Sequence, residues 1–330
     1  MKISFYYAQN PEIKWRNWTI LNVGLGGVYV SIYNLAKEFQ KMGHEVTIWG
    51  HILKQDIYNG INFIDISHYT SDYKEDLLIG VETFPQVTKA KKVVTWAYRN
   101  TPKSANLINE TIFRSEIHAT ILKELIKDKT YIIPDGVDLD LFKPEKKRQK
   151  DVTCISHPIK TFKHFREITP RLKEIDKNIN VHLWGNAEIW GWNNDEFINL
   201  QNDLIMSGNL YHGREGQTKI TKELNKSKVF LYPSNFEEPF GLSVLEAMAS
   251  GCVPIVSKVG NLPNLVKDCG YIIDGKPDDF GWITKAIEKT LKILNNENLF
   301  TERSKLCRKK AEQYGWTEVA QKWSDQILKK

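Results

Sequence analysis

A chain of 330 residues with 41% hydrophobic and 26% charged residues has the composition of a globular protein with room for two domains. No run of eighteen apolar residues is present, which excludes a membrane-spanning helix, and the opening segment MKISFYYAQN lacks the apolar core of a signal peptide. The net charge of +6 is dispersed over helical segments, so it predicts no nucleic-acid partner and allows only a weak peripheral contact with an anionic membrane.

The first half of the chain predicts alternating strands and helices. A strand over residues 2–7 precedes a glycine-rich turn at 24–27 and a helix with apolar residues between Tyr29 and Phe39. Further strands are expected over residues 45–49, 62–66, 77–81 and 93–97. Residues 110–125 show helical periodicity. This pattern is typical of a Rossmann-like domain, although the glycines do not have the G-x-G-x-x-G spacing of a dinucleotide site.

The second half begins after a basic linker over residues 143–150. Asp138 and Asp140, just before it, have the spacing of a metal-binding Asp-x-Asp, but the preceding Pro-Asp-Gly turn favours a structural role. Strands are expected over 153–156 and 181–184, a further strand is expected to end at 211–214, and a last helix is expected over 317–328. The four cysteines show no metal-ligand spacing and are expected to be reduced thiols of a cytoplasmic protein.

The stretch from Val229 to Asp274 carries the clearest chemistry. An apolar strand ends in a polar loop, and a helical pattern starts near Leu242 and ends at Gly251. The amides that open such a helix can bind an anion, and a carboxylate one turn further in, Glu246, can accept both hydroxyls of a ribose. From periodicity alone, a solvated helix with two ordinary surface glutamates, Glu238 and Glu246, is equally compatible.

This stretch resembles a known signature. The segments EPFGL at 238–242 and LEAMASG at 245–251 look like the Glu-x7-Glu motif of retaining glycosyltransferases of family 4 (group 1). The similarity continues to Gly270. It implies an α/β fold of GT-B architecture, with two Rossmann-like domains and a cleft between them. The expected domains are an acceptor domain over 1–145, a nucleotide-sugar domain over 146–312 and a helix crossing back over 313–330.

The resemblance also implies residue roles. Glu246 is expected to hold the ribose, the amides of the helix start to bind the diphosphate, and Glu238 to lie near the donor sugar. Lys160 is expected to contact the diphosphate and to act in catalysis, with Lys163 as the alternative. The remaining donor-binding residues implied by the family are Gly26, Gly27, Arg214, Phe240, Gly241, Leu242 and Ser243.

One position departs from the family pattern. Relatives commonly have a histidine near the reacting sugar, after the strand that corresponds to residues 93–97, and this chain has Tyr98 there. A phenol offers one hydrogen-bond donor and one acceptor, so Tyr98 is predicted to hold a sugar hydroxyl across the cleft from Glu238.

Together these features predict a retaining transferase that moves a hexose from a nucleotide diphosphate sugar to a glycan, lipid-linked or small-molecule acceptor. Neither a metal nor a cofactor is expected, because the helix amides and Lys160 serve the diphosphate. A sugar-nucleotide epimerase or phosphorylase on the same fold and a non-catalytic sugar-nucleotide binder are the alternatives. A dinucleotide oxidoreductase would rest on the glycines at 24–27 alone. The expected location is cytoplasmic, with peripheral membrane contact allowed.

Overall fold

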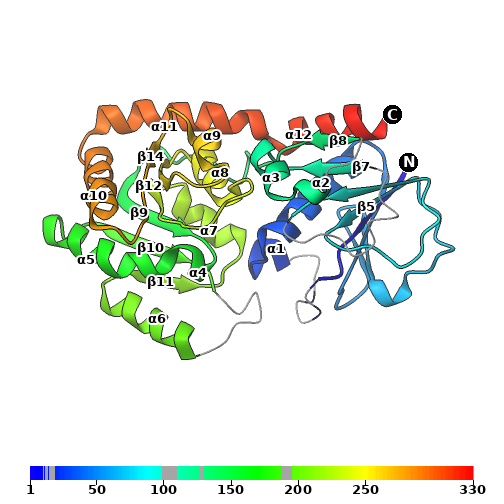
Figure 1. Cartoon of the computed structure of the whole chain (residues 1–330), viewed down its shortest axis with the longest axis horizontal. Coiled ribbons are helices and arrows are strands. Elements are labelled where there is room, and N and C mark those ends of the chain that lie inside the picture. Colours follow the sequence, from blue (N-terminus) through cyan, green and yellow to red (C-terminus); the bar gives the residue numbers. More distant parts are fainter. Residues whose placement is uncertain are drawn as a thin grey trace. The chain divides into compact units, whose positions relative to one another are not determined.

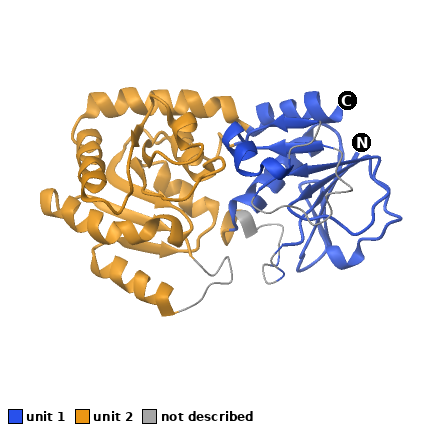
Figure 2. Cartoon of the chain, in the orientation of Figure 1, with its two compact units in different colours: residues 1–20, 25–136, 316–330 blue, residues 21–24, 137–315 orange. Residues whose placement is uncertain are grey.

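The computed structural model describes residues 1–9, 11, 14, 19–98, 110–125, 129–186 and 195–329 (Figure 1). The chain divides into two compact units (Figure 2). Unit 1 consists of residues 1–20, 25–136 and 316–330, and unit 2 consists of residues 21–24 and 137–315. The domain boundaries predicted from the sequence, at 145/146 and 312/313, stay predictions.

Unit 1 is built around an eight-stranded sheet in the order β3-β4-β2-β1-β5-β6-β7-β8. Neighbouring strands of this sheet are parallel, except that β3 pairs antiparallel with β4 at one edge. The strands are β1 (Lys2–Tyr6), β2 (Glu45–Gly50), β3 (Asp56–Tyr58), β4 (Ile61–Asp65), β5 (Leu77–Val81), β6 (Lys92–Trp96), β7 (Glu110–Phe113) and β8 (Thr130–Ile132). Every residue of β5 is buried, as expected for a central parallel strand covered on both faces.

The helices of unit 1 include two that are far apart in the sequence and pack together. Helix α2 (Gly27–Lys41) contacts α12 (Trp316–Trp323), where the Thr317 hydroxyl donates to Glu38 Oε2 over 3.2 Å and Trp323 meets Phe39 edge-on. This contact places the C-terminal segment in unit 1. The other helical segments near this unit are α1 (Thr19–Asn22), η1 (Ile66–His68), α3 (Glu116–Ile121), η3 (Lys123–Leu125) and the π-helix η7 (Ser324–Leu328).

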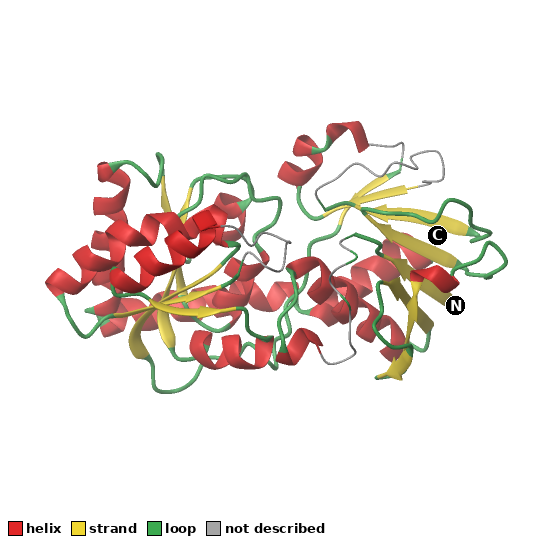
Figure 3. Ribbon diagram, turned by 90° about the horizontal axis from the view of Figure 1, so that it is seen from below, coloured by secondary structure: helices red, strands yellow, loops and turns green. Residues whose placement is uncertain are grey.

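Unit 2 contains a six-stranded sheet, parallel throughout, with helices on both sides (Figure 3). Its order is β11-β10-β9-β12-β13-β14, which is the Rossmann order 3-2-1-4-5-6. The strands are β9 (Gln149–Ile155), β10 (Asn180–Trp184), β11 (Leu210–Gly213), β12 (Ser227–Tyr232), β13 (Val253–Ser257) and β14 (Tyr271–Ile273). The helices are α4 (Pro158–Thr161), η4 (Phe162–His164), α5 (Phe165–Ile175), α6 (Asp195–Met206), α7 (Gln217–Leu224), α8 (Leu242–Ala249), α9 (Leu262–Val266), α10 (Phe280–Leu294), α11 (Glu297–Ala311) and η6 (Glu312–Tyr314).

The two parallel α/β units confirm the predicted fold class. Helix α8 begins at Leu242 and its last six residues, Val244–Ala249, are buried, which explains why the sequence pattern there is apolar almost all round. Asp138 has the structural surroundings expected of a turn, because its Oδ1 accepts from the amides of Asp140 and Leu141. All four cysteines are free and buried.

The helical interpretation of residues 110–125 is wrong for its first part. Residues Glu110–Phe113 form strand β7, and only a short helix, α3, follows. The strand forms because β6 and β8 offer parallel partners on both sides, and β-branched Thr111 and Ile112 suit a buried sheet. Among the helices of the described residues, none is long and apolar enough to cross a membrane.

Candidate functional site

The candidate site of unit 2 lies where the order of its sheet reverses. Strand β9 comes first in the chain and lies in the middle of the sheet. The chain then adds β10 and β11 on one side of β9 and continues with β12 on its other side. At such a switch point the loops after neighbouring parallel strands diverge and leave room for a ligand. The loop after β9 leads into α4, which carries Lys160, and the loop after β12 carries Glu238.

Three side chains converge at this point, and we call them the switch-point cluster: Lys160, Tyr232 and Glu238. Lys160 Nζ lies 2.6 Å from Glu238 Oε1, and the Tyr232 hydroxyl donates to the same oxygen over 2.8 Å. Glu238 is only 6% exposed, so its charge is stabilised by these two donors rather than by water. Burial, followed by the charge of Glu238, raises the pKa of Tyr232 well above its ordinary value, so the phenol stays protonated and donates.

The two lysines named as alternatives have different surroundings. Lys160 has a largely buried side chain, and its ammonium also lies 4.0 Å from the centre of the Phe236 ring. Lys163, on the 3₁₀ turn η4, has an exposed side chain that pairs with Asp278 Oδ2 over 3.2 Å. The structure therefore brings Lys160, and not Lys163, to Glu238.

The start of helix α8 follows Glu238 directly. Its N-cap residue, Gly241, has φ = 102°, a left-handed conformation that side chains rarely adopt, and a Cβ there would lie 2.7 Å from Leu262 Cδ2. Phe240 and Gly241 are buried, whereas Leu242 and Ser243 are partly exposed. The first amides of a helix have no carbonyl partner within it, so this turn presents donors and the positive end of the helix dipole.

The backbone at Glu238 is held by a second glycine. Gly260 has φ = 50°, and a Cβ at this position would lie 2.3 Å from the Glu238 carbonyl oxygen. The amide of Asn261 donates to that same carbonyl over 2.8 Å, and the Gly260 amide donates to the side chain of Glu237. The loop that carries Glu238 is therefore fixed against the start of α9.

Glu246 lies one turn into α8 and is 8% exposed. Its Oε1 accepts a hydrogen bond of 2.9 Å from the side-chain amide of Gln217, the first residue of α7. A neutral donor at one oxygen orients the carboxylate without neutralising it, which suits an acceptor of ribose hydroxyls.

The other predicted donor residues lie elsewhere. Arg214, after β11, donates from Nε to the carbonyl oxygen of Gly24 over 2.8 Å, and both residues belong to unit 2. Gly26 is the N-cap of α2 and Gly27 its first residue, and both belong to unit 1. Gly27 is exposed, and the Gly26 carbonyl accepts from the amides of Tyr29 and Val30 as the helix begins.

Tyr98 lies in a buried network of unit 1 that we call the Asp135 cluster: Tyr98, Arg114 and Asp135. The Tyr98 hydroxyl donates to Asp135 Oδ1 over 3.0 Å, and Arg114 Nη1 lies 3.2 Å from Asp135 Oδ2. The guanidinium also stacks 4.0 Å from the centre of the Tyr98 ring. Tyr98 is 3% exposed, and a contact of its hydroxyl with a donor sugar stays a prediction.

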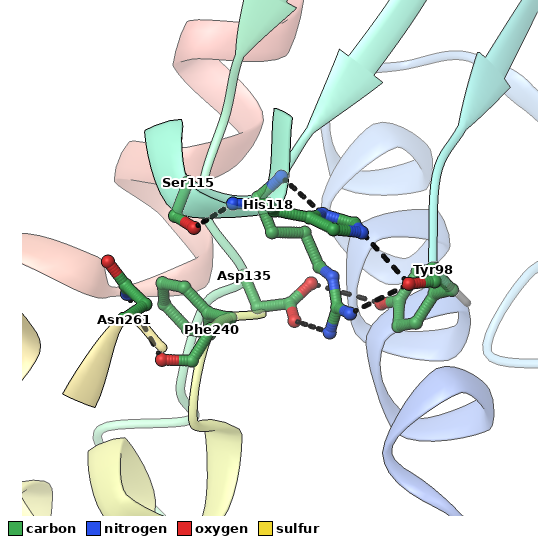
Figure 4. Close-up of polar contacts among 7 residues, drawn as sticks. Tyr98, Ser115, His118, Asp135, Phe240 and Asn261 are labelled. Atoms are coloured by element: carbon green, nitrogen blue, oxygen red, sulfur yellow. Dashed lines mark hydrogen bonds and ion pairs between the residues drawn. The ribbon is translucent and has the colours of Figure 1, made fainter. Parts of the chain in front are cut away.

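His118, a residue of α3, contacts the Asp135 cluster. Figure 4 shows its ring beside Tyr98, whose carbonyl oxygen lies 2.9 Å from His118 Nε2, while Nδ1 accepts from the Arg114 amide over 3.3 Å. Both ring nitrogens thus have a hydrogen-bond partner when the ring is neutral and its proton is on Nε2. Burial, with the nearby Arg114 charge as the second cause, lowers the pKa of His118 to about 3, and burial raises the pKa of Asp135.

Sequence reasoning missed several residues that the structure brings to these sites. Tyr232 is the last residue of an apolar strand, where a single aromatic residue is ordinarily part of the core. Gln217 is distant in sequence from Glu246 and belongs to no motif. The only sequence signal for Gly260 is its place in the family resemblance.

A family of known proteins matches the part of the chain that carries this site. The family model of glycosyl transferases group 1 matches residues 142–313, which include the whole switch-point cluster and α8. An α-(1→4)-mannosyltransferase of Mycolicibacterium hassiacum is 24% identical over 202 residues, which cover 58% of this chain and 46% of that protein. The O-antigen chain mannosyltransferase B of Escherichia coli is 36% identical over 90 residues, which cover 27% of this chain and 22% of that protein. The chain thus spans less than half the length of the curated relatives it matches.

Solved structures share the fold over nearly the whole chain. Sucrose-phosphate synthase from Thermosynechococcus elongatus has a TM-score of 0.72 at 14% identity and covers 99% of this chain and 98% of its own. HepE from Anabaena, solved in complex with UDP-glucose, has a TM-score of 0.71 at 14% identity and covers 100% of both chains. The predicted GT-B architecture is thereby confirmed. Because the family model matches more than half of its residues, this chain belongs to the glycosyl transferases of group 1.

Proposed function

We propose that this chain is a retaining glycosyltransferase that moves a hexose from a nucleotide diphosphate sugar to an acceptor. The observation that carries the proposal is the switch-point cluster, which joins a lysine, a tyrosine and a glutamate directly before helix α8. A cation, a carboxylate and a helix start within one short region suit a diphosphate leaving group attached to a sugar.

Each part of the donor then has a counterpart in unit 2. Glu246, oriented by Gln217, accepts the ribose hydroxyls, and the amides at the start of α8 bind the diphosphate. Lys160 reaches the same diphosphate from α4, the short helix that follows β9. Glu238 holds Lys160 in place before the donor arrives and lies beside the sugar afterwards.

The chemical step follows from this placement. The bond between the anomeric carbon and the diphosphate oxygen breaks, and the leaving diphosphate keeps the electron pair. The α8 amides and Lys160 stabilise the charge that develops on it. The acceptor oxygen forms the new bond on the face that the diphosphate leaves, which retains the anomeric configuration, and the acceptor loses its proton. Retention is inferred from the resemblance to the family.

Positive charge for the leaving group is supplied by the chain itself, so we propose that transfer needs no metal ion. Chelator that abolishes transfer without lowering the melting temperature, with recovery on adding a divalent ion, would contradict this. For Tyr98 only the oxygen lone pair remains to accept a bond from a sugar hydroxyl, because its proton is donated to Asp135. Cytoplasmic location and peripheral membrane contact stay predictions.

The experiment that tests the proposal begins with a panel of sugar nucleotides. A ligand that binds only the folded chain raises its melting temperature, and UDP-glucose is the first to try, since it is bound in HepE. Stabilising donors are then incubated with candidate acceptors, and the anomeric configuration of the product is read by NMR. A product with inverted configuration would contradict retention.

A non-catalytic sugar-nucleotide binder is the second candidate function. The observation that favours it is Tyr98, which replaces the family's usual histidine and whose hydroxyl donates to Asp135. The panel of sugar nucleotides and acceptors distinguishes the two functions. Consumption of a donor in the presence of an acceptor supports the transferase, whereas tight binding with no consumption under every acceptor tested supports the binder.

A further inference from the structure

A second group of ionisable side chains lies in unit 2 outside the proposed donor site, and we call it the Asp151 cluster: Asp151, His182 and Glu223. Asp151 is in β9, His182 in β10 and Glu223 near the end of α7. Asp151 is in register with Asn180, two residues before His182, so Asp151 and His182 point to the same face of the sheet. All three residues are more than nine-tenths buried.

Two atoms of this cluster face each other without a hydrogen bond. Asp151 Oδ1 accepts from the side-chain amide of Asn180 over 3.0 Å, but Oδ2 has no partner among the residues that the structure describes. His182 Nε2 is likewise buried and without a partner in the described part of the chain, and it lies 3.8 Å from Asp151 Oδ2. That distance is too long for a hydrogen bond.

The other ring nitrogen of His182 is occupied. Nδ1 lies 2.9 Å from His212 Nε2, so a proton on Nδ1 can be donated to His212 and the lone pair of His182 is then on Nε2. In that arrangement a lone pair faces a carboxylate oxygen in a buried environment, which is unfavourable unless a cation lies between them.

We propose that the Asp151 cluster binds one divalent transition-metal ion of the zinc class. Zinc takes histidine nitrogen at about 2.0–2.1 Å and carboxylate oxygen at about 2.0–2.2 Å, so two ligand atoms of a tetrahedral ion lie about 3.4 Å apart. The separation of 3.8 Å between His182 Nε2 and Asp151 Oδ2 is slightly longer than this spacing, and a small movement of the two side chains towards an ion closes the difference. One ligand atom of each of the three residues lies within 4.8 Å of the other two. Glu223 Oε2 lies 3.5 Å from His182 Nδ1, so this carboxylate has to move towards the ion to become its third ligand, and a water then completes a tetrahedral set.

The neighbours of the cluster support the ligands. His212 and Asn180 hold the non-ligating nitrogen of His182 and oxygen of Asp151, as partners of metal ligands ordinarily do. Glu223 is paired with Lys226, 3.1 Å away, and its Oε1 accepts from the Ser227 hydroxyl. Lys226 is partly exposed, so its ammonium can turn to solvent when Glu223 binds an ion.

A bound ion would act on the structure and not on the chemical step. It would join β9, β10 and α7, and α7 begins with Gln217, which orients Glu246. The proposal is independent of the proposed transferase activity, because metal binding can be measured without donor or acceptor. The three residues lie on separate elements with no short spacing, which is why no metal motif is visible along the chain.

The test uses the full chain, freed of metal by chelation and dialysis. We expect one equivalent of Zn²⁺ to bind by calorimetry, and Co²⁺ at the same site to show the visible absorption of a tetrahedral ion. Asp151→Asn and His182→Gln should each weaken Zn²⁺ binding by more than about tenfold. Tenfold is the lower end of the loss found when only a residue that supports a metal ligand is removed. His68→Gln, which removes an exposed histidine of unit 1, is the control and should bind as the wild type does.

A measurement on the wild type keeps the test independent of whether the variants fold. In ¹⁵N NMR, the His182 Nε2 signal should shift on adding one equivalent of Zn²⁺. A ring that is protonated on both nitrogens at neutral pH and is unaffected by Zn²⁺ would show that a proton fills the position instead. Either that result, or Zn²⁺ affinity unchanged in both cluster variants, overturns the proposal.

Discussion

Each unit holds a carboxylate that accepts from a tyrosine hydroxyl and pairs with a basic side chain, but the two clusters differ in their surroundings. In the Asp135 cluster both carboxylate oxygens are occupied, Asp135 is fully buried, and Arg114 is stacked on the tyrosine ring. In the switch-point cluster both donors use one oxygen, Oε1 of Glu238, and the basic group is a lysine. A carboxylate, a tyrosine and a basic side chain thus form a closed network in unit 1, whereas in unit 2 both donors converge on one carboxylate oxygen.

The choice of basic residue follows this difference. Arginine presents a planar fork that suits a fixed, buried pair, whereas the lysine ammonium is a point charge on a flexible stem that can be shared with an arriving anion. The switch-point cluster also adjoins the start of α8, where helix amides add donors. We therefore interpret the Asp135 cluster as structural and the switch-point cluster as the site that binds ligand.

The largest effect is expected from breaking the Asp135 cluster. Asp135→Ala leaves the Arg114 guanidinium buried without its partner and should lower the free energy of unfolding by roughly 3–5 kcal/mol. Glu238→Gln should cost less stability, because the Lys160 side chain can reach water. Urea denaturation of both variants measures the difference. Equal losses would mean that the two clusters do not differ in the way proposed.

The variant Glu246→Gln tests whether Glu246 binds the ribose of the donor. A carboxylate that accepts two ribose hydroxyls loses charge-assisted hydrogen bonds, so donor affinity should fall by about 1.5–3 kcal/mol while the fold is kept. Calorimetry with the donor found in the panel measures this loss. Gln217→Met, which removes only the side chain that orients Glu246, is the matched variant and should lose less. Unchanged affinity in Glu246→Gln would contradict the ribose assignment.

The pH dependence of stability should come in part from His118, which contacts the Asp135 cluster. The pKa of His118 is about 3 in the folded chain against 6.5 ordinarily, so between these values the unfolded chain binds a proton that the folded chain does not. Stability should therefore fall as the pH drops from about 6.5 towards 4, by about 1 kcal/mol per pH unit from this residue. In His118→Gln the fall over the same window should be shallower. An unchanged slope would show that His118 is not the group responsible.

Tyr98→Phe is expected to have the smallest effect. The ring and its stacking on Arg114 are kept, and only the hydrogen bond to Asp135 is lost, so the free energy of unfolding should fall by about 0.5–1.5 kcal/mol. Donor affinity and the transfer rate are measured in parallel. Loss of transfer with intact donor binding would give Tyr98 the predicted role at the sugar, whereas full activity would confine it to the structure.

Much of the switch-point cluster and of the fold could be predicted from the sequence. The start and end of α8 rest on local signals, namely glycines and helix periodicity. The choice of Lys160 over Lys163 rests on the family resemblance and on its position after a strand. Contacts between elements distant in the chain could not be predicted, because no local pattern encodes them. Gln217 against Glu246 and the partners of Asp135 are such contacts, and strand β7 forms only because its neighbours in the sheet are present.

The central claim is that the switch-point cluster binds the donor through Lys160, and the pair Lys160→Ala and Lys163→Ala tests it most directly. Turnover is measured for both variants with the donor and acceptor identified in the panel, and melting temperature confirms that each is folded. The account predicts that Lys160→Ala lowers turnover by about 10²–10³, the loss found when one donor to a developing charge is removed, while Lys163→Ala stays near the wild type. An unchanged rate in Lys160→Ala together with an inactive Lys163→Ala would contradict it.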